Sequence, residues 1–180
     1  MKKIITLVLI TLLALTSYAQ GGKRRGGAQA AGITKIEAAQ VPDAVKSAFT
    51  VQATDTRWEK HEATGKAGKA HVRYVAIYTQ DGVKARARFK EDGTPVSASK
   101  YMGAQKLPAA IQSAATTKNP GAKLVGGEEL TTKDGKVYYR VRLRNGGSRI
   151  TSVFDANGGE ITKDKMTDDI KAGEEEDGGN

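Results

Sequence analysis

Two blocks of this chain recur along its length, and this internal similarity is the feature that most constrains the fold. Residues Val41–Ala48 align with residues Leu107–Ala114, 66 positions later. Residues Phe89–Gly93 align with residues Phe154–Gly158, 65 positions later. Between the blocks each copy carries a tyrosine in a β-rich run, Tyr74 and Tyr139. The order and chemistry agree across the copies, so the sequence predicts a duplication.

Each copy is predicted to begin with a helix. Pro42 and Pro108 suit a first helical position, where the missing N–H costs nothing. Apolar residues then recur at a spacing of four, which places them on one helix face. They are Val41, Val45 and Phe49 in the first copy and Leu107, Ile111 and Ala115 in the second. The sequence Asn119-Pro120-Gly121 is expected to end the second helix.

A period of two follows each helix. Residues 83–90 alternate apolar side chains with lysine and arginine. In the second copy Val137, Tyr139, Val141 and Leu143 alternate with Arg140, Arg142 and Arg144. Asp-Gly and Asn-Gly pairs, at 81–82, 92–93, 134–135, 145–146 and 157–158, are typical hairpin turns. The pattern predicts an α+β fold: two tandem helix-plus-antiparallel-meander repeats, forming sheets with helices on one face. Because about 60 residues bury little core alone, the two halves should share a surface.

The N-terminal residues have the layout of a secretory signal peptide. Lys2 and Lys3 precede a run from Ile4 to Leu15 in which ten of twelve residues are apolar. Small residues at Ser17 and Ala19 place the cleavage before Gln20. The apolar run is too short for a membrane anchor, which needs about 20 residues. We therefore expect a periplasmic or secreted protein.

The whole chain divides into five segments by composition. We expect a signal peptide at 1–19, a flexible, basic, Gly-rich leader at 20–37, a first repeat at 38–103, a second at 104–167 and a disordered acidic tail at 168–180. The tail carries six acidic residues against Lys171, whereas the whole chain has a net charge of +9. The tail could therefore fold back and screen the positive body.

Candidate metal and phosphate sites are weak. A metal could use His61, His71 and a nearby carboxylate, but the spacing matches no zinc signature, which favours two ordinary strand histidines. Gly65–Ala70 lacks the spacing of a phosphate loop. Asp155–Glu160 is too short for a calcium loop and is better explained as a turn. We expect no metal and no cofactor.

The sequence contains no recognisable arrangement of catalytic residues. Hydrolysis needs a nucleophile with a base in reach, or two positioned carboxylates. The chain has no cysteine and two histidines, and it contains no Gly-x-Ser-x-Gly sequence. The absence of cysteine also excludes disulfide scaffolds, thiolate metal sites and a lipid anchor on cysteine. The chain is therefore predicted not to be an enzyme, although an unfamiliar active site is the competing interpretation.

The strongest candidate for a binding surface is a basic sheet face. Period two places seven cations on one side of two strands. The predicted basic face is Lys84, Arg86, Arg88, Lys90, Arg140, Arg142 and Arg144. Neither strand interleaves acids among them, and guanidinium groups bind carboxylate and phosphate bidentately. The face could dock an acidic partner or serve only to keep the sheet soluble.

The order of elements resembles a known family. A Pro-led helix, Trp58-Glu59-Lys60, an aromatic strand and the Phe-Asp-x-x-Gly sequence at 154–158 resemble the PepSY-like, β-lactamase-inhibitor-like exported proteins of Bacteroidetes. The likeness spans about residues 38–166. It implies tandem helix-plus-four-strand modules and, from the related inhibitors, a concave sheet that binds an enzyme. Lys90 and Leu124 depart from the family's aspartate and tryptophan, and the resemblance places Trp58 in the core.

We expect an exported, non-catalytic binding module that docks an acidic protein or an anionic envelope component through the basic face. The alternative is an inhibitor of a periplasmic or secreted hydrolase. Inhibitor interfaces present aromatic anchors, and the candidates are Trp58, Tyr74, Tyr78, Tyr101, Tyr138 and Tyr139. Nucleic acid fits less well, because no aromatic residues interleave the cations on that face. The oligomeric state is left open.

Overall fold

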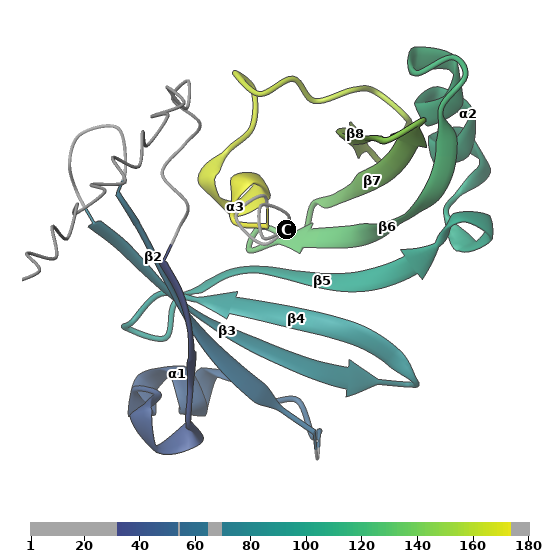
Figure 1. The fold of residues 1–180 in the computed structure, drawn as a ribbon. Coiled ribbons are helices and arrows are strands. Elements are labelled where there is room, and N and C mark those ends of the chain that lie inside the picture. The colour runs from purple at the N-terminus through teal and green to yellow at the C-terminus, as the bar shows by residue number, and fades with distance from the viewer. Residues whose placement is uncertain (1–31, 54, 65–69, 174–180) are drawn as a thin grey trace, which may run out of the picture.

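A computed structural model describes residues 32–53, 55–64 and 70–173. They form one antiparallel sheet in which eight strands pair in sequence order (Figure 1). The strands are β1 (Gly32–Ile36), β2 (Arg57–Thr64), β3 (Ala70–Gln80), β4 (Val83–Phe89), β5 (Pro95–Gly103), β6 (Lys123–Thr132), β7 (Val137–Asn145) and β8 (Ser148–Asp155). The helices are α1 (Asp43–Ala48), α2 (Ala109–Lys118) and α3 (Asp168–Lys171), with 3-10 turns η1 (Ala38–Gln40) and η2 (Ala104–Lys106).

The predicted turns connect the strands. Asp81 and Gly82 both have positive φ between β3 and β4, at 53° and 72°. Gly93, Gly135 and Gly146 have positive φ in the next three hairpins of this kind. This backbone region is costly for residues with a side chain, which is why glycine occupies it. The meander predicted from the Asp-Gly and Asn-Gly pairs is confirmed.

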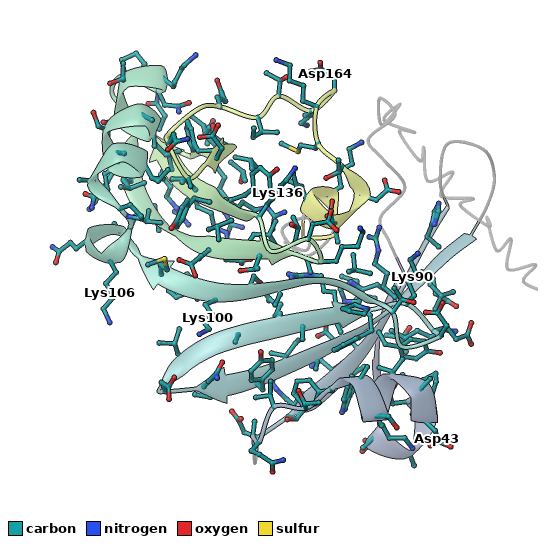
Figure 2. The ribbon with its side chains drawn as sticks, turned by 180° about the vertical axis from the view of Figure 1, so that it is seen from behind. Asp43, Lys90, Lys100, Lys106, Lys136 and Asp164 are labelled. Atoms are coloured by element: carbon teal, nitrogen blue, oxygen red, sulfur yellow. The ribbon has the colours of Figure 1, made fainter. Side chains whose placement is uncertain are left out.

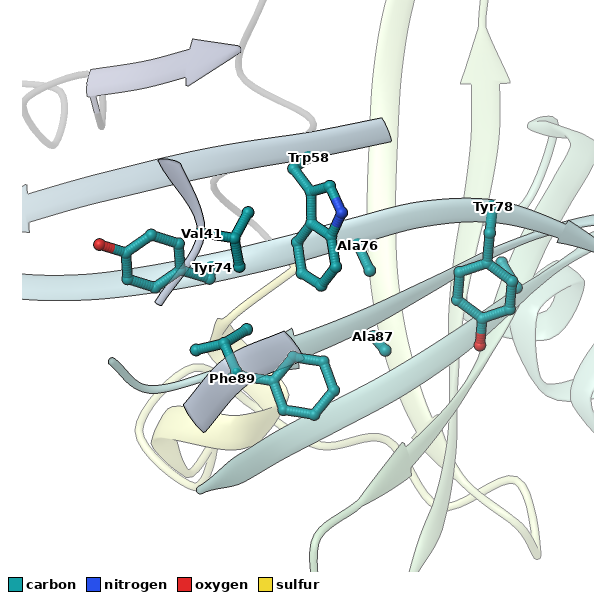
Figure 3. Packing of buried hydrophobic residues seen from close by; sticks show 9 residues of the cluster. Val41, Trp58, Tyr74, Ala76, Tyr78, Ala87 and Phe89 are labelled. Carbon is teal, nitrogen blue, oxygen red and sulfur yellow. The ribbon is translucent and has the colours of Figure 1, made fainter. Parts of the chain in front are cut away.

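The first core lies between α1 and strands β2 to β4 (Figure 3). Val41 and Val45 are buried there, as the spacing of four predicts. Phe49, at the end of α1, packs edge-on against Trp58 with ring centroids 5.4 Å apart. Trp58 is 7% exposed, so its predicted place in the core is confirmed. Burying such large rings contributes much of the stability of a small core.

The second core lies under α2. Leu107, Ile111 and Ala115 are buried against the apolar side of β7 and β8. The helix ends at Lys118, where Asn119 is the C-cap, as predicted. Each helix lies close to the glycine of a later turn. An added Cβ at Gly93 would lie 2.5 Å from the Ala44 carbonyl oxygen of α1, and an added Cβ at Gly158 would lie 3.3 Å from the Ala110 carbonyl oxygen of α2.

The tyrosines of the two blocks occupy matching register positions. Tyr74 in β3 lies opposite Phe89 in β4, and Tyr139 in β7 lies opposite Phe154 in β8. The two halves nevertheless do not form separate sheets, because β5 pairs with β6 along seven residues. The shared surface that the sequence predicts is thus a continuous hydrogen-bonded sheet.

The structure corrects the predicted architecture in one respect: the helices do not all lie on one face. Ile170 of α3 packs with Leu130, Val153 and Met166. Leu130 and Val153 point away from α2, because side chains alternate between the faces of a strand. We call this side of the sheet the α3 face. Figure 1 shows α3 beside the middle strands, away from α1 and α2.

The predicted boundaries also shift at both ends. β1 begins at Gly32, inside the segment predicted to be a flexible leader, and pairs with β2. α3 lies inside the predicted acidic tail, and Gly173 after it is buried. The predicted signal peptide, leader residues 20–31 and tail residues 174–180 lie outside the described residues. No helix in the described ranges is long and apolar enough to cross a membrane.

Candidate functional site

The seven cations of the predicted basic face have different environments. Ala85 and Ala87 pack under α1, and Tyr139 and Val141 pack under α2. The intervening cations of the two strands therefore lie on the α3 face. Their exposure does not match the prediction: Arg88 and Arg140 are buried, Arg86 and Arg142 are half-buried, and Lys84, Lys90 and Arg144 are exposed.

A buried carboxylate explains why these arginines can lie together. Glu128 in β6 is 2% exposed. Arg142 Nη2 donates to Glu128 Oε1 over 2.6 Å, and Arg86 Nη1 donates to the same oxygen over 3.3 Å. Arg140 Nη1 lies 3.6 Å from Glu128 Oε2. Together with Arg88, these residues form what we call the arginine network.

The charge of the network controls the ionisation of Glu128. Burial by itself would raise the pKa of this carboxyl, since the charged form loses its hydration. The guanidinium groups of Arg142, Arg88, Arg140 and Arg86 outweigh burial and hold the pKa below its ordinary value of 4.5. Glu128 is therefore a carboxylate at neutral pH, and it offsets part of the repulsion between the arginines.

The two most buried arginines also have structural partners outside this carboxylate. Arg88 Nη1 donates to Ser99 Oγ over 3.2 Å. Arg140 Nη2 donates to the Ile170 carbonyl oxygen of α3 over 2.6 Å. The predicted docking role for Arg88 and Arg140 is therefore wrong, because both side chains are buried and hydrogen-bonded inside the protein. The sequence argument failed because it looked for acids within β4 and β7, whereas the acid lies in β6.

The exposed members at the ends of the predicted face lie apart from this network. Lys90, together with His71, Arg73 and Asp168, lines a pocket of about 570 Å³. Arg144 is exposed at the far end of β7, opposite Arg149 of β8. Figure 2 shows Lys90 at one end of the sheet and Lys100 and Lys106 toward the other. The seven cations thus do not form one continuous docking surface.

A second pocket of about 410 Å³ opens over the network, and it is our candidate site. We call it the Glu128 pocket. Its charged lining residues are Lys35, Arg57, Lys84, Arg86 and Arg142 with Glu59 and Glu128. Five cations against two carboxylates leave an excess of positive charge. Such a hollow favours anionic groups, above all the carboxylates and phosphates that guanidinium binds bidentately.

Tyr101 gives this pocket an aromatic wall. The side chain is 45% exposed, although tyrosine is usually more deeply buried. Its hydroxyl lies over Gly126 of β6, where an added Cβ would be only 3.0 Å away. Glycine therefore leaves room for the ring. Tyr101 was among the aromatic candidates in the sequence, whereas Lys35 and Arg57 were missed because no pattern links β1 and β2 to β4.

The histidines do not assemble a metal site. His61 is buried, and its Nε2 lies 3.0 Å from Glu59 Oε2. His71 is exposed on the neighbouring strand. Among the described residues, no three His, Asp or Glu side chains gather closely enough to hold a metal ion.

Three solved structures share this fold at low sequence identity. A DUF2874 family protein from Bacteroides ovatus is 12% identical with a TM-score of 0.54, and the match covers 67% of this chain and 84% of that one. A predicted periplasmic protein from Bacteroides eggerthii is 18% identical with a TM-score of 0.55, covering 68% and 86%. A BLIP-like protein from Bacteroides fragilis is 19% identical with a TM-score of 0.52, covering 67% and 84%.

These matches establish a fold shared with a BLIP-like protein. They fit the β-lactamase-inhibitor-like part of the resemblance seen in the sequence, while its PepSY-like part stays a prediction. No protein-family model matches the sequence, and no curated protein matches it either.

Proposed function

We propose that this chain is an exported, non-catalytic binding module that docks an acidic protein in the Glu128 pocket. The observation that carries the proposal is the excess of cations around a hollow on the sheet. Lys35, Arg57 and Lys84 are exposed there, and no ion pair among the described residues involves them. Their charges are thus available to a carboxylate of a partner.

The chemistry of the pocket favours a protein over a lipid or polysaccharide. Tyr101 stands exposed beside the cations, and tyrosine with arginine is typical of the centre of protein interfaces. A phosphate-bearing envelope component would need only the cations. Export is supported by the fold shared with a predicted periplasmic protein and by the signal-peptide pattern at residues 1–19.

A narrower function, inhibition of an envelope hydrolase, has one observation in its favour: the fold shared with a BLIP-like protein. In that case the acidic partner would be the hydrolase itself, and the same pocket would contact it. The two proposals differ in their effect on the partner's turnover. An inhibitor must reduce that turnover, whereas a docking module need only bind.

Removing the exposed pocket cations should weaken the binding of an acidic probe. In the triple variant that combines Lys35→Ser, Arg57→Ser and Lys84→Ser, the affinity for a fluorescent hexaglutamate peptide is expected to fall by about tenfold or more. The remaining binding should also depend less on salt, because fewer charges are screened. Fluorescence anisotropy across a salt series measures both effects.

A matched control removes equal charge elsewhere. Lys100, Lys106 and Lys123 are exposed and outside the pocket, so their triple change to serine should leave hexaglutamate affinity within about twofold, since distant surface charges are screened. Equal losses in both triple variants would contradict a localised site. Binding of lipid A vesicles but not of hexaglutamate would contradict a protein partner and favour an anionic envelope component.

A further inference from the structure

The two edge strands of the sheet differ in how the chain covers them. At β8 the chain folds back, so that Ile161 N donates to the Val153 carbonyl oxygen over 2.8 Å. Glu160 also forms a bridge with Phe154 of this strand. β1 pairs with β2 on one side, and within the described ranges no segment pairs with its other side. Alternate N–H and C=O groups of β1 therefore point away from the sheet.

β1 lacks the features that usually keep an edge strand from pairing. Natural edges are blunted by prolines, bulges or several charges. β1 has no proline, pairs with β2 in unbroken register, and has Lys35 as its single charged residue. Residues 32–35 are exposed. β1 is thus a template for an added strand, a recognition mode in which main-chain hydrogen bonds supply affinity and alternate side chains supply specificity.

Two side chains of β1 lie on the α3 face of the sheet. Ile36 packs against the first core, so Ile33 and Lys35 point to the opposite side. Lys35 lines the Glu128 pocket there. Ile33 is 42% exposed, so an apolar residue opposite it would remove apolar surface from water. In an added antiparallel strand, the residue opposite Lys35 comes two positions before the residue opposite Ile33.

The Glu128 pocket continues to the end of β1. A smaller hollow of about 280 Å³ shares Lys35, Arg57 and Glu59 with it. Ile36, the last residue of β1, also lines this smaller hollow. A strand that is added antiparallel to β1 would therefore begin beside the cations Lys35 and Arg57 and then run along the edge, away from the pocket.

We propose that the acidic partner docks as an extended segment that adds to β1 as a further strand, with a carboxylate opposite Lys35 and an apolar side chain opposite Ile33. This inference rests on the proposed function, because it states how the partner of the Glu128 pocket is held. Charge favours this occupant over a second copy of the chain. Two paired β1 strands would bring the cations Lys35 and Arg57 of both copies together, and like charges destabilise such a pairing.

Peptides with modified backbones test the added strand. The probe is the fluorescent peptide Glu-Glu-Glu-Thr-Val-Thr, whose acids would lie toward the pocket and whose valine would lie opposite Ile33. Two versions are N-methylated at alternate residues, in complementary patterns. The version that keeps the N–H groups facing β1 should bind within about twofold of the parent peptide, whereas the other should lose about tenfold or more in affinity. Equal affinities of the two versions would overturn the proposal.

An aliphatic variant tests the specificity of the edge. Ile33→Thr keeps a β-branched residue in the strand and should lower the affinity for the probe by about threefold or more. Its affinity for hexaglutamate should stay within about twofold. Val125→Thr is the matched control, because Val125 is 45% exposed in β6 and lies outside both hollows. Equal losses of probe affinity in the two variants would contradict a contact at Ile33.

Amide exchange measured by NMR separates the other occupants. Alternate amides of β1 should exchange rapidly in the free protein and slowly with the probe bound. Slow exchange of all β1 amides before the probe is added would mean that another part of the chain or a second copy covers the edge, which contradicts the proposal. If hexaglutamate binds and the two N-methylated versions bind alike, only the strand proposal fails. If hexaglutamate does not bind and the two versions still differ, the proposed function fails instead.

Discussion

Replacing Glu128 by glutamine is expected to lower the free energy of unfolding by about 3–5 kcal/mol, the usual cost of removing one partner from a buried ion pair. The neutral amide keeps the size of the side chain but cannot offset the charges of Arg86, Arg88, Arg140 and Arg142. Urea denaturation followed by circular dichroism measures the loss. Glu62→Gln is the matched control, because Glu62 is exposed and pairs only with Lys60 among the described ion pairs.

The same variant should have a different response to acid. Since the folded pKa of Glu128 is held below 4.5, its carboxylate stabilises the fold above that pH. This contribution is lost as the pH falls through the lower folded value. The stability difference between parent and Glu128→Gln should therefore shrink on acidification below pH 4.5. A difference that is small at neutral pH, or independent of pH, would contradict the role given to Glu128.

Replacing Arg140 by methionine is expected to cost about 1.5–3 kcal/mol, because a hydrogen bond from a charged donor to the Ile170 carbonyl is lost. Methionine fills most of the space of the arginine stem without its charge. The loss should be concentrated in α3, so amide exchange of Ile170 and Ala172 should accelerate more than that of the β7 core. Hydrogen exchange measured by NMR resolves the two regions.

Arg144→Met supplies the control, since Arg144 lies on the same strand and the same face but is exposed. It should leave both the stability and the exchange of α3 unchanged. Should Arg140→Met fold poorly, the double variant with Glu128→Gln gives a second readout. Removing both charges should cost less than the sum of the single changes, because each single change leaves a charge buried. Strict additivity would contradict the pairing of Glu128 with Arg140.

The local parts of the fold could be predicted because neighbouring residues determine them. The spacing of Val41 and Val45 depends only on helix geometry, and the turns depend on residues such as Asp81 and Gly82 with positive φ. These signals extend over a few positions and need no tertiary partner. The helix faces and hairpins were accordingly found from the sequence, with boundaries shifted by a few residues.

The candidate site could not be predicted in the same way, because it depends on register between distant strands. Glu128 meets Arg140 only through the pairing of β6 with β7, and Tyr101 only through the pairing of β5 with β6. A shift of one residue would place Glu128 on the other face. Lys35 was missed because no sequence pattern links β1 to β4, and because the Gly-rich run before it led residues 20–37 to be predicted as a flexible leader.

The central claim is that an acidic partner docks in the Glu128 pocket rather than along the whole cationic strip. NMR titration of isotope-labelled protein with hexaglutamate tests it most directly. We predict that the largest shifts occur at the amides of Lys35, Lys84 and Tyr101 and follow one binding curve. Largest shifts at Lys90 or Arg144, or no shifts at all, would contradict the claim.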